Sequence, residues 1–158
     1  MIERQAVQET RMALFRAAVV TDCLGETDLG VRRIGIALLH TESLRRVFAR
    51  IGVQQATVIA AIDATDPSFD ECEQRVAQEL AASGHAFASK EHQASVRLRP
   101  LAPDVKGVFD RLIERDGALE VSPVDLLVDL LDHHAVLAEM FAVHGLTASA
   151  LRAADDQR

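Results

Sequence analysis

One sequence pattern occurs twice in this chain, and the duplication constrains the fold more than any other feature. The stretch Val121–Leu146 follows the same order of apolar residues and glycine as the stretch Val31–Val53. The aligned positions, first copy against second, are Ile34–Leu39 with Leu126–Leu131, Val47–Ala49 with Met140–Ala142, Gly52 with Gly145, and Val53 with Leu146. The spacing of roughly 90 residues exceeds the ~20–50 residues of solenoid repeats, so the sequence predicts a duplicated helical subdomain.

The composition favours an all-α domain. The chain has 158 residues, of which 49% are hydrophobic, so it can bury a sizeable core as one domain or as two halves that share a core. Alanine and leucine are strong helix formers, and long runs of β-branched or aromatic residues are missing from the sequence. We therefore expect a folded chain made of helices.

Charge and hydropathy argue against two classes of partner. The formal net charge of −7 would repel the phosphates of nucleic acid. No apolar run reaches the ~18–20 residues of a membrane span, and the polar amino terminus does not resemble a signal peptide. We therefore expect a cytoplasmic protein that binds neither nucleic acid nor a membrane.

The two cysteines leave two alternatives open. Cys23 and Cys72 both lie in helical patterns, at positions that suit small buried residues. They could form a disulfide, but reduced thiols are the expectation for a cytoplasmic chain. Cys72 has no histidine nearby in the sequence that would activate it as a nucleophile, so we expect a packing residue there.

Apolar spacing predicts four helices in the first half of the chain. Apolar residues recur at i, i+3, i+4 and i+7 from Leu44 to Ile51, the pattern of an amphipathic helix. Gly52 follows where a left-handed residue would end this helix, and Val53 could make the apolar contact of a Schellman motif. The expected helices are 3–22, 31–39, 44–51 and 56–62.

A linker with one helix is predicted between the two copies, over residues 65–100. Ser68 and Glu71 form a capping-box pattern, which indicates a helix over about 68–83. Val96 and Leu98 alternate with arginines, so a short extended segment is also possible in this linker.

The second half repeats the order of one long helix and three short ones. Pro103 opens the first helix, and Ser122 with Pro123 supplies the N-cap and first residue of the second. Gly145 ends the third helix, and Thr147 caps a last short helix that extends to about residue 155.

These paired four-helix patterns resemble the Clp amino-terminal repeat domain, the small helical module at the front of Clp-type AAA+ unfoldases such as ClpA, ClpB and ClpC. The resemblance covers residues 3–155, and its most specific parts are Leu101–Lys106 and Glu120–Leu131. It implies an all-α fold of two pseudo-twofold-related four-helix Clp repeats packed together, with an extra helix in the linker. The implied single domain, 1–158, contains repeat 1 (3–64), the linker (65–100) and repeat 2 (101–155).

The chain departs from this family at the start of the second helix of each repeat. The family begins that helix with Thr-Glu-His, and in ClpC-type domains the glutamates hold the guanidinium of phosphoarginine. The corresponding positions here are Val31-Arg32-Arg33 and Pro123-Val124-Asp125. Arg32 would repel a guanidinium and Val124 offers it no partner, so we do not expect phosphoarginine recognition.

The resemblance implies a non-catalytic module that docks adaptors or substrate polypeptides for a Clp-type unfoldase. ClpA-type domains dock their adaptor through acidic residues near the first-repeat loop, a role that Glu26 and Asp28 could partly serve. With the usual pseudo-twofold, a groove between the repeats would be flanked by residues from both halves. The candidate partner-binding residues are Glu26, Asp28, Arg32, Arg33, Glu120, Val124 and Asp125.

No ATPase motif accompanies these repeats. No stretch matches G-x-x-x-x-G-K-[ST], and the two lysines, Lys90 and Lys106, lie outside glycine-rich loops. We therefore expect either a free-standing Clp repeat protein or the repeat part of an unfoldase, with no enzymatic activity, metal or cofactor of its own. A free-standing decoy that sequesters the ligands of an unfoldase is an alternative.

A small helical hydrolase or metalloprotein is the alternative from another class. His133 and His134 beside Asp132 suggest metal or acid–base chemistry, but adjacent helical histidines point about 100° apart and the i, i+4 ligand pair of a helical zinc site is missing. Turn residues between two helices are the simpler interpretation. Asp125, Asp129 and Asp132 are expected to form a solvated helix face, with a partner surface as the alternative.

Overall fold

The chain folds into an all-α structure, which confirms the predicted fold class at this level. The computed structural model describes residues 4–65, 68–83, 100–116 and 120–156. The helices are α1 (Arg4–Cys23), α2 (Val31–Leu38), α3 (Glu42–Ile51), α4 (Gln55–Thr65), α5 (Ser68–Ser83), α7 (Pro103–Asp116), α8 (Pro123–His133), α9 (Ala135–Ala142) and α10 (Ala148–Asp155). None of the helices within these ranges combines the length and apolar character that crossing a bilayer requires.

The predicted helix starts are confirmed where the structure describes the capping side chains. The hydroxyl of Ser122 accepts a hydrogen bond from the N–H of Asp125 at 3.1 Å, at the start of α8. The hydroxyl of Thr147 accepts one from the N–H of Ala150 at 3.1 Å, at the start of α10. These bonds satisfy N–H groups that have no partner within the first helical turn.

A helix is also present where one was expected over about 68–83, because α5 spans Ser68–Ser83. The extended segment that the alternation around Val96 suggests lies outside the described residues. The first residues described after it, however, make an extended contact. The N–H of Leu29 donates to the carbonyl of Pro100 at 2.9 Å, and the N–H of Ala102 donates to the carbonyl of Leu29 at 3.0 Å. This isolated bridge joins the loop before α2 to the segment before α7.

The turns after α3 and α9 are closed by similar hydrogen bonds. Gly52 follows α3 directly, whereas Gly145 lies three residues beyond Ala142, the last residue of α9. Both glycines have positive φ, +87° and +76°, a conformation that glycine adopts without steric cost. The bonds that close these ends run from the N–H of Val53 to the carbonyl of Phe48 (2.9 Å) and from the N–H of Leu146 to the carbonyl of Phe141 (3.2 Å). Both phenylalanines are fully buried, so each helix end is anchored in the core.

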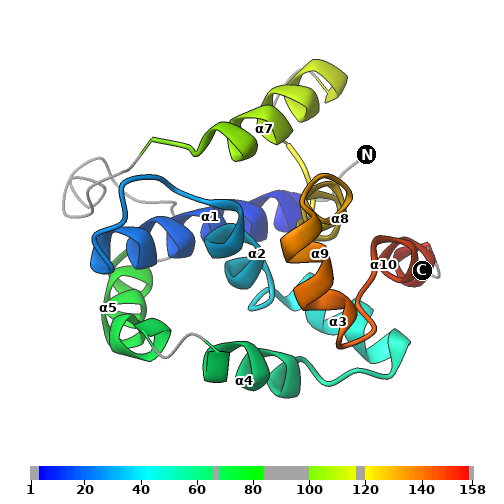
Figure 1. Ribbon diagram of the computed structural model, residues 1–158, viewed down its shortest axis with the longest axis horizontal. Coiled ribbons are helices and arrows are strands. Elements are labelled where there is room, and N and C mark those ends of the chain that lie inside the picture. Colours follow the sequence, from blue (N-terminus) through cyan, green and yellow to red (C-terminus); the bar gives the residue numbers. More distant parts are fainter. Residues whose placement is uncertain (1–3, 66–67, 84–99, 117–119, 157–158) are drawn as a thin grey trace.

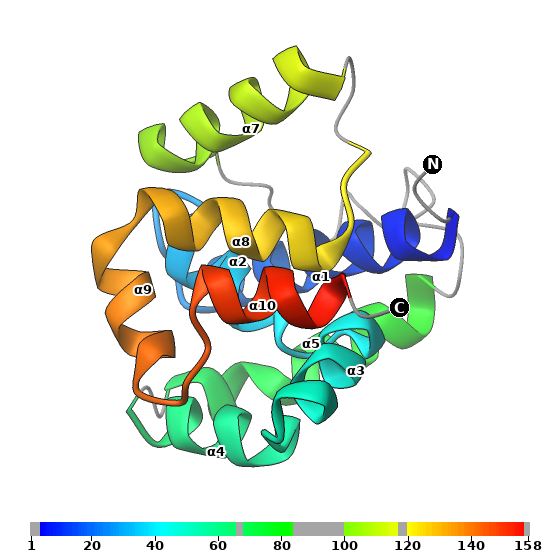
Figure 2. The same ribbon diagram turned by 90° about the vertical axis from the view of Figure 1, so that its right-hand side faces the viewer.

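Helix α8 lies at the centre of the fold. It packs against α1, α2, α3, α7, α9 and α10, and Figure 2 shows it below α7 and behind α10. Its buried residues are Pro123, Val124, Leu126, Leu127, Val128, Leu130 and Leu131. A helix that is apolar on most of its circumference must be enclosed, so the other helices are arranged around it.

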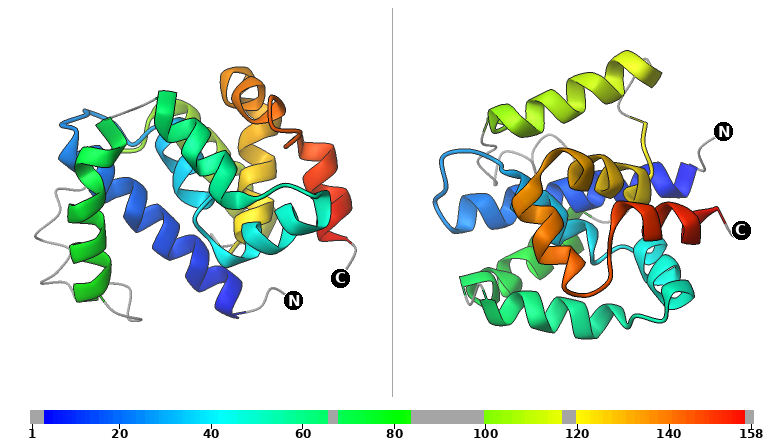
Figure 3. Two further views of the ribbon diagram at one scale, coloured as in Figure 1. Left: turned by 90° about the horizontal axis from the view of Figure 1, so that it is seen from below. Right: turned by 45° about the vertical axis from the view of Figure 1, so that its right-hand side comes forward.

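Three helices lie at the edges of this arrangement. Helix α7 packs on α8 and crosses the top of the molecule in Figure 1. Helix α4 packs on α3, and α5 packs on α1, near whose carboxyl-terminal end it lies in Figure 3. Because α5 lies at the edge and packs on α1, a link between these two helices would hold this side of the molecule in place.

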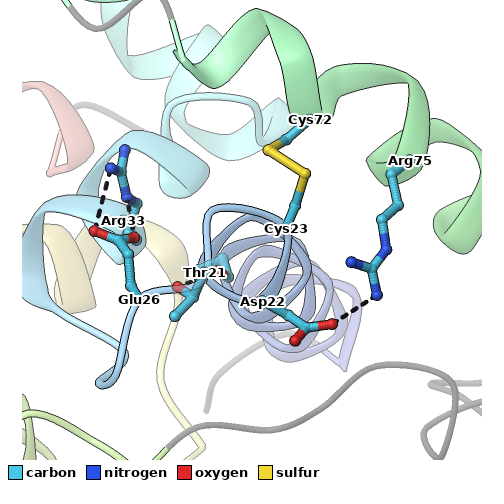
Figure 4. The surroundings of a disulfide bond; sticks show 8 residues. Thr21, Asp22, Cys23, Glu26, Arg33, Cys72 and Arg75 are labelled. Carbon is cyan, nitrogen blue, oxygen red and sulfur yellow. Dashed lines mark hydrogen bonds and ion pairs between the residues drawn. A yellow bond between two sulfur atoms is a disulfide. The ribbon is translucent and has the colours of Figure 1, made fainter.

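A disulfide supplies that link, so the expectation of reduced thiols is wrong for this structure. Cys23, the last residue of α1, is bonded to Cys72 of α5, and their Cα atoms are 5.9 Å apart. Beside it, the guanidinium of Arg75 donates to the carboxylate of Asp22 at 2.6 Å (Figure 4). Burial of both thiols in helical patterns was visible in the sequence, but their proximity depends on how α5 folds back along α1.

We predict that breaking this disulfide destabilises the fold. It joins residues 49 positions apart, and constraining a loop of that length in the unfolded chain is worth about 4 kcal/mol. Urea unfolding of the wild-type protein should therefore shift to a lower midpoint when dithiothreitol is added. The variant Cys23→Ser should unfold near the reduced wild type and should not respond to dithiothreitol. Equal midpoints for oxidised and reduced wild type would contradict this prediction.

Helix α2 approaches α9 closely because residue 35 is glycine. A Cβ atom at Gly35 would lie 3.1 Å from the methyl groups of Leu137, which is buried. The aligned position in the other copy is Leu127, so the two copies differ here. The closest contact between α2 and α9 therefore requires the smallest residue.

Substitution Gly35→Leu should lower the free energy of unfolding by about 1–3 kcal/mol, because a buried side chain would be forced against Leu137. Combining it with Leu137→Ala should make the two substitutions non-additive, since the smaller residue makes room for the larger one. Additive losses in denaturant titrations would show that the two positions do not compete for space.

Candidate functional site

Two of the predicted surface residues in the first half bind each other. The Nε of Arg33 donates to the carboxylate of Glu26 at 2.7 Å, and the side chain of Arg33 is only 11% exposed. Asp28 and Arg32 are exposed, in the loop before α2 and in its first turn. Arg33 therefore joins the loop to α2. A partner could reach Asp28, Arg32 and also Glu26, whose side chain is 39% exposed.

The predicted residues of the second half lie at the amino-terminal end of α8. Glu120 and Asp125 are exposed, whereas Val124 is 3% exposed and belongs to the core. The hydroxyl of Thr10 donates to the carbonyl of Val121 at 2.7 Å, so this end of α8 lies against α1. A partner could reach Glu120 and Asp125 here, but not Val124.

The structure separates these two groups along α8. Arg32 lines a cavity together with His133, the last residue of α8. Asp125 precedes His133 by eight positions, a rise of about 12 Å along the helix axis. All seven predicted residues are described, and Arg32 is the one among them that lines this cavity.

We call this space the junction cavity, because it lies where α2, α7 and the turn between α8 and α9 meet. Its volume is about 320 Å³. Its lining residues are Val31, Arg32, Asp104, His133, His134, Ala135, Val136, Leu137 and Met140. The lining thus combines aliphatic side chains with one arginine, two histidines and one aspartate.

The apolar part of the junction cavity opens onto an exposed side of α9. Val136 is 83% exposed and Met140 is partly buried. Val143, one turn beyond Met140, is also 83% exposed. These two valines are the most exposed of the large apolar residues that the structure describes, and exposed apolar residues that form a contiguous patch mark contact surfaces. The short run of apolar residues in α9 is the sequence signal from which this surface could have been found.

The polar part of the junction cavity is held by contacts across the turn. The Nδ1 atom of His134 lies 3.6 Å from the Oδ2 atom of Asp104, which places the start of α7 beside the α8–α9 turn. His133 and His134 therefore lie at the junction of two helices, as the simpler interpretation proposed. Among the described residues, no group of three or more histidine, cysteine, aspartate or glutamate side chains could hold a metal ion.

Of the acidic residues expected to form a solvated face of α8, Asp125 and Asp132 are exposed and Asp129 is partly buried. Asp132 forms an ion pair with Arg152 of α10, and a carboxylate oxygen of Asp129 lies 3.8 Å from an arginine of α7, Arg115. Burial raises the pKa of Asp129, although Arg115 and His133 act in the opposite direction. Asp125 remains exposed. These carboxylates thus connect α8 to its neighbours, and exposed pairs of this kind add at most about 1 kcal/mol each.

A second and larger cavity lies along the amino-terminal half of α1, and we call it the α1 groove. Its volume is about 710 Å³, within the range of ligand sites in proteins. It is lined by Arg4, Gln5, Gln8, Glu9, Met12, Ala13 and Arg16 of α1, and by Ala37, His40, Thr41 and Glu42 of the α2–α3 turn. No residue of this groove is among the predicted partner-binding residues, although Arg4, Gln8, Met12 and Arg16 recur at every fourth position of α1.

His40 lies in the wall of the α1 groove as a neutral side chain. Burial, and secondarily the charge of Arg16, lower the pKa of His40 from 6.5 to about 4. The carboxylate of Glu9 accepts hydrogen bonds from the N–H (3.0 Å) and the hydroxyl (2.6 Å) of Ser43. These contacts fix the turn after α2 against α1.

Comparisons with known proteins found none similar to this chain. No family model, no curated protein and no solved structure matches it.

We predict that His40 makes stability depend on pH. Because the folded pKa is lower than the unfolded one, the unfolded chain takes up a proton below pH 6.5 that the folded chain does not take up until about pH 4. The contribution is therefore fully present above pH 6.5 and is lost as the pH falls toward 4, by up to about 3 kcal/mol.

The variant His40→Gln should lose this part of the pH dependence. Urea unfolding of both proteins at pH 7.5, 6 and 5 would measure the difference between them. Carboxylates such as Asp129 are common to both proteins and cancel in that difference. Parallel stability curves for the two proteins would show that His40 is not the responsible group.

Proposed function

We propose that this chain is a non-catalytic protein-interaction module of the Clp amino-terminal repeat type, which docks adaptors or substrate polypeptides for a Clp-type AAA+ unfoldase. The observation that carries the proposal is the equivalence of the two halves. The aligned residues Phe48 and Phe141 are buried alike, and their carbonyls accept hydrogen bonds from the N–H groups of the aligned residues Val53 and Leu146. This equivalence supports a duplicated helical unit, which the resemblance to the Clp repeats requires.

The packing of the central helices supports the pseudo-twofold arrangement of the proposal. Helices α2 and α8, which the repeat aligns with each other, are in contact. A rotation that exchanges α2 with α8 and α3 with α9 would turn the contact of α3 with α8 into the contact of α2 with α9. Both contacts occur. The correspondence is weaker for the last helix of each half, since α10 packs on α3 and α8 whereas α4 packs on α3.

We propose the junction cavity and the exposed side of α9 as the docking surface. This surface offers aliphatic anchors, Val136 and Met140, beside the cation of Arg32. Interfaces commonly combine an apolar centre with polar groups at the rim. Of the predicted partner-binding residues, this proposal retains Arg32 as a direct contact, and Asp28 and Asp125 as exposed residues outside the cavity.

The proposal includes a cytoplasmic location, where disulfides are rare because thiols are kept reduced. The bond between Cys23 and Cys72 makes this part of the proposal testable by itself. Thiol alkylation in intact cells, followed by mass spectrometry, would measure the oxidation state of the pair. Complete oxidation would favour an oxidising compartment and would remove the cytoplasmic location.

We predict that Val136→Asp weakens docking and that Val143→Asp does not. Both valines are 83% exposed and lie at opposite ends of α9, but Val136 lines the junction cavity and Val143 does not. Isothermal titration of the purified chain against a Clp-type unfoldase, and against an adaptor of that unfoldase, would measure the Kd. Burying a carboxylate at the contact should raise the Kd tenfold or more, or about 1.4 kcal/mol.

A degradation assay separates docking from sequestration. Addition of the chain to an unfoldase, its peptidase and a fluorescent substrate should accelerate degradation if the chain delivers substrates, and should slow it if the chain acts as a decoy. Absence of binding to any component would contradict the proposed function. Equal effects of Val136→Asp and Val143→Asp would place the docking surface elsewhere.

A further inference from the structure

We propose that the bond between Cys23 and Cys72 is a reversible redox switch, which holds α5 on α1 when it is oxidised and releases α5 when a dithiol reduces it. Loss of the bond lowers the stability of the whole fold, but the switch concerns one helix in a chain that otherwise stays folded. The inference goes beyond the docking function and does not depend on it, because the switch is a property of the fold.

Helix α5 has a small described contact with the core apart from the bond. It lies at the edge of the molecule and packs mainly on α1 (Figure 1, Figure 3). Of the α5 side chains that the structure describes, Cys72 and Val76 are buried, and the others are exposed or partly exposed. Since Cys72 belongs to the disulfide, Val76 is the other buried side chain in this group. The covalent bond is therefore a large part of what joins α5 to α1.

An ion pair lies beside the bond. The guanidinium of Arg75, three residues after Cys72, donates to the carboxylate of Asp22 at 2.6 Å (Figure 4). The two side chains are 33% and 13% exposed, so solvent and salt reach the pair and weaken it. We expect this contact to orient α5 on α1, but not to hold it there once the disulfide is open.

The bond can be opened from the α1 side. Cys23 is partly exposed and Cys72 is fully buried, so the sulfur of Cys23 is the more accessible to an external thiolate. Attack there forms a mixed disulfide with Cys23 and releases Cys72 as a thiolate, and the second thiol of the reductant then releases Cys23. Two electrons and two protons pass from the dithiol to the cysteine pair, and the dithiol becomes a disulfide. Disulfides of cytoplasmic proteins are commonly transient or redox-sensing, so the proposed location suits a bond that opens and closes.

Hydrogen–deuterium exchange of the full chain, read by mass spectrometry, tests the switch with dithiothreitol as the reductant. In the oxidised protein, amides of residues 74–79 in α5 should exchange about tenfold more slowly than in an unfolded peptide of the same sequence, or slower still. After reduction they should exchange within about twofold of that peptide, because an isolated helix of 16 residues is marginal in water. Amides of residues 126–131 in α8 should remain protected by about a hundredfold or more in both states.

Reoxidation should restore the first state. When oxidised glutathione replaces dithiothreitol, the cysteine pair gives two electrons and two protons to it, two molecules of glutathione form, and α5 should regain its protection. The variant Cys23→Ser should show a released α5 with or without dithiothreitol.

A pair of matched variants separates the bond from the ion pair beside it. Asp22→Asn removes the charge that faces Arg75 but keeps the disulfide, so α5 should stay protected in the oxidised variant. Asp132→Asn makes the same change at another ion pair, with Arg152, and should leave the exchange of α5 unchanged in both redox states.

Protection of α5 that survives reduction would overturn the inference. Loss of protection in α8 together with α5 would overturn it as well, since the bond would then hold the whole fold and not one helix. Release of α5 by Asp22→Asn in the oxidised protein would assign the hold to the ion pair, and no recovery on reoxidation would show that there is no switch. None of these outcomes bears on the docking surface, because a Kd that Val136→Asp raises would support the proposed function whatever α5 does.

Discussion

The burial of α8 is the constraint on which the rest of the structure depends. Its leucines and valines cover most of the helix surface, so water must be excluded on nearly every side. The first and second halves of the chain both contribute to this enclosure, through α1, α2 and α3 and through α7, α9 and α10. Neither half buries α8 alone, which explains why one chain of this size forms a shared core.

Polar contacts fix the positions of helices and loops but contribute little to the free energy of folding. The ion pairs of Asp132 and Glu26, and the bond from Thr10 to the carbonyl of Val121, fix how helices and loops meet at the surface of the core. The disulfide acts at the edge, where α5 lies along α1 and can contribute little to the core around α8. A covalent link is most useful at such a place, because it constrains the unfolded chain whatever the local packing.

Both candidate surfaces lie where helices diverge from the core. The junction cavity opens at the turn between α8 and α9, and the α1 groove opens beside the turn between α2 and α3. Each combines aliphatic side chains with arginine and with an acidic residue that has a contact within the chain, Asp104 with His134 in the junction cavity and Glu9 with Ser43 in the α1 groove.

Local order was determined by the sequence alone. The periodicity of apolar residues, the caps at Ser122 and Thr147 and the helix-ending glycines all act within a few residues, so the helices and their ends could be predicted. The tertiary structure decided which surfaces meet. It buried Val124, joined Cys23 to Cys72, exposed Val136 and separated the predicted partner residues along α8. These outcomes depend on the directions in which helices cross, and crossing directions follow from side-chain packing between segments distant in the chain, which local patterns do not encode.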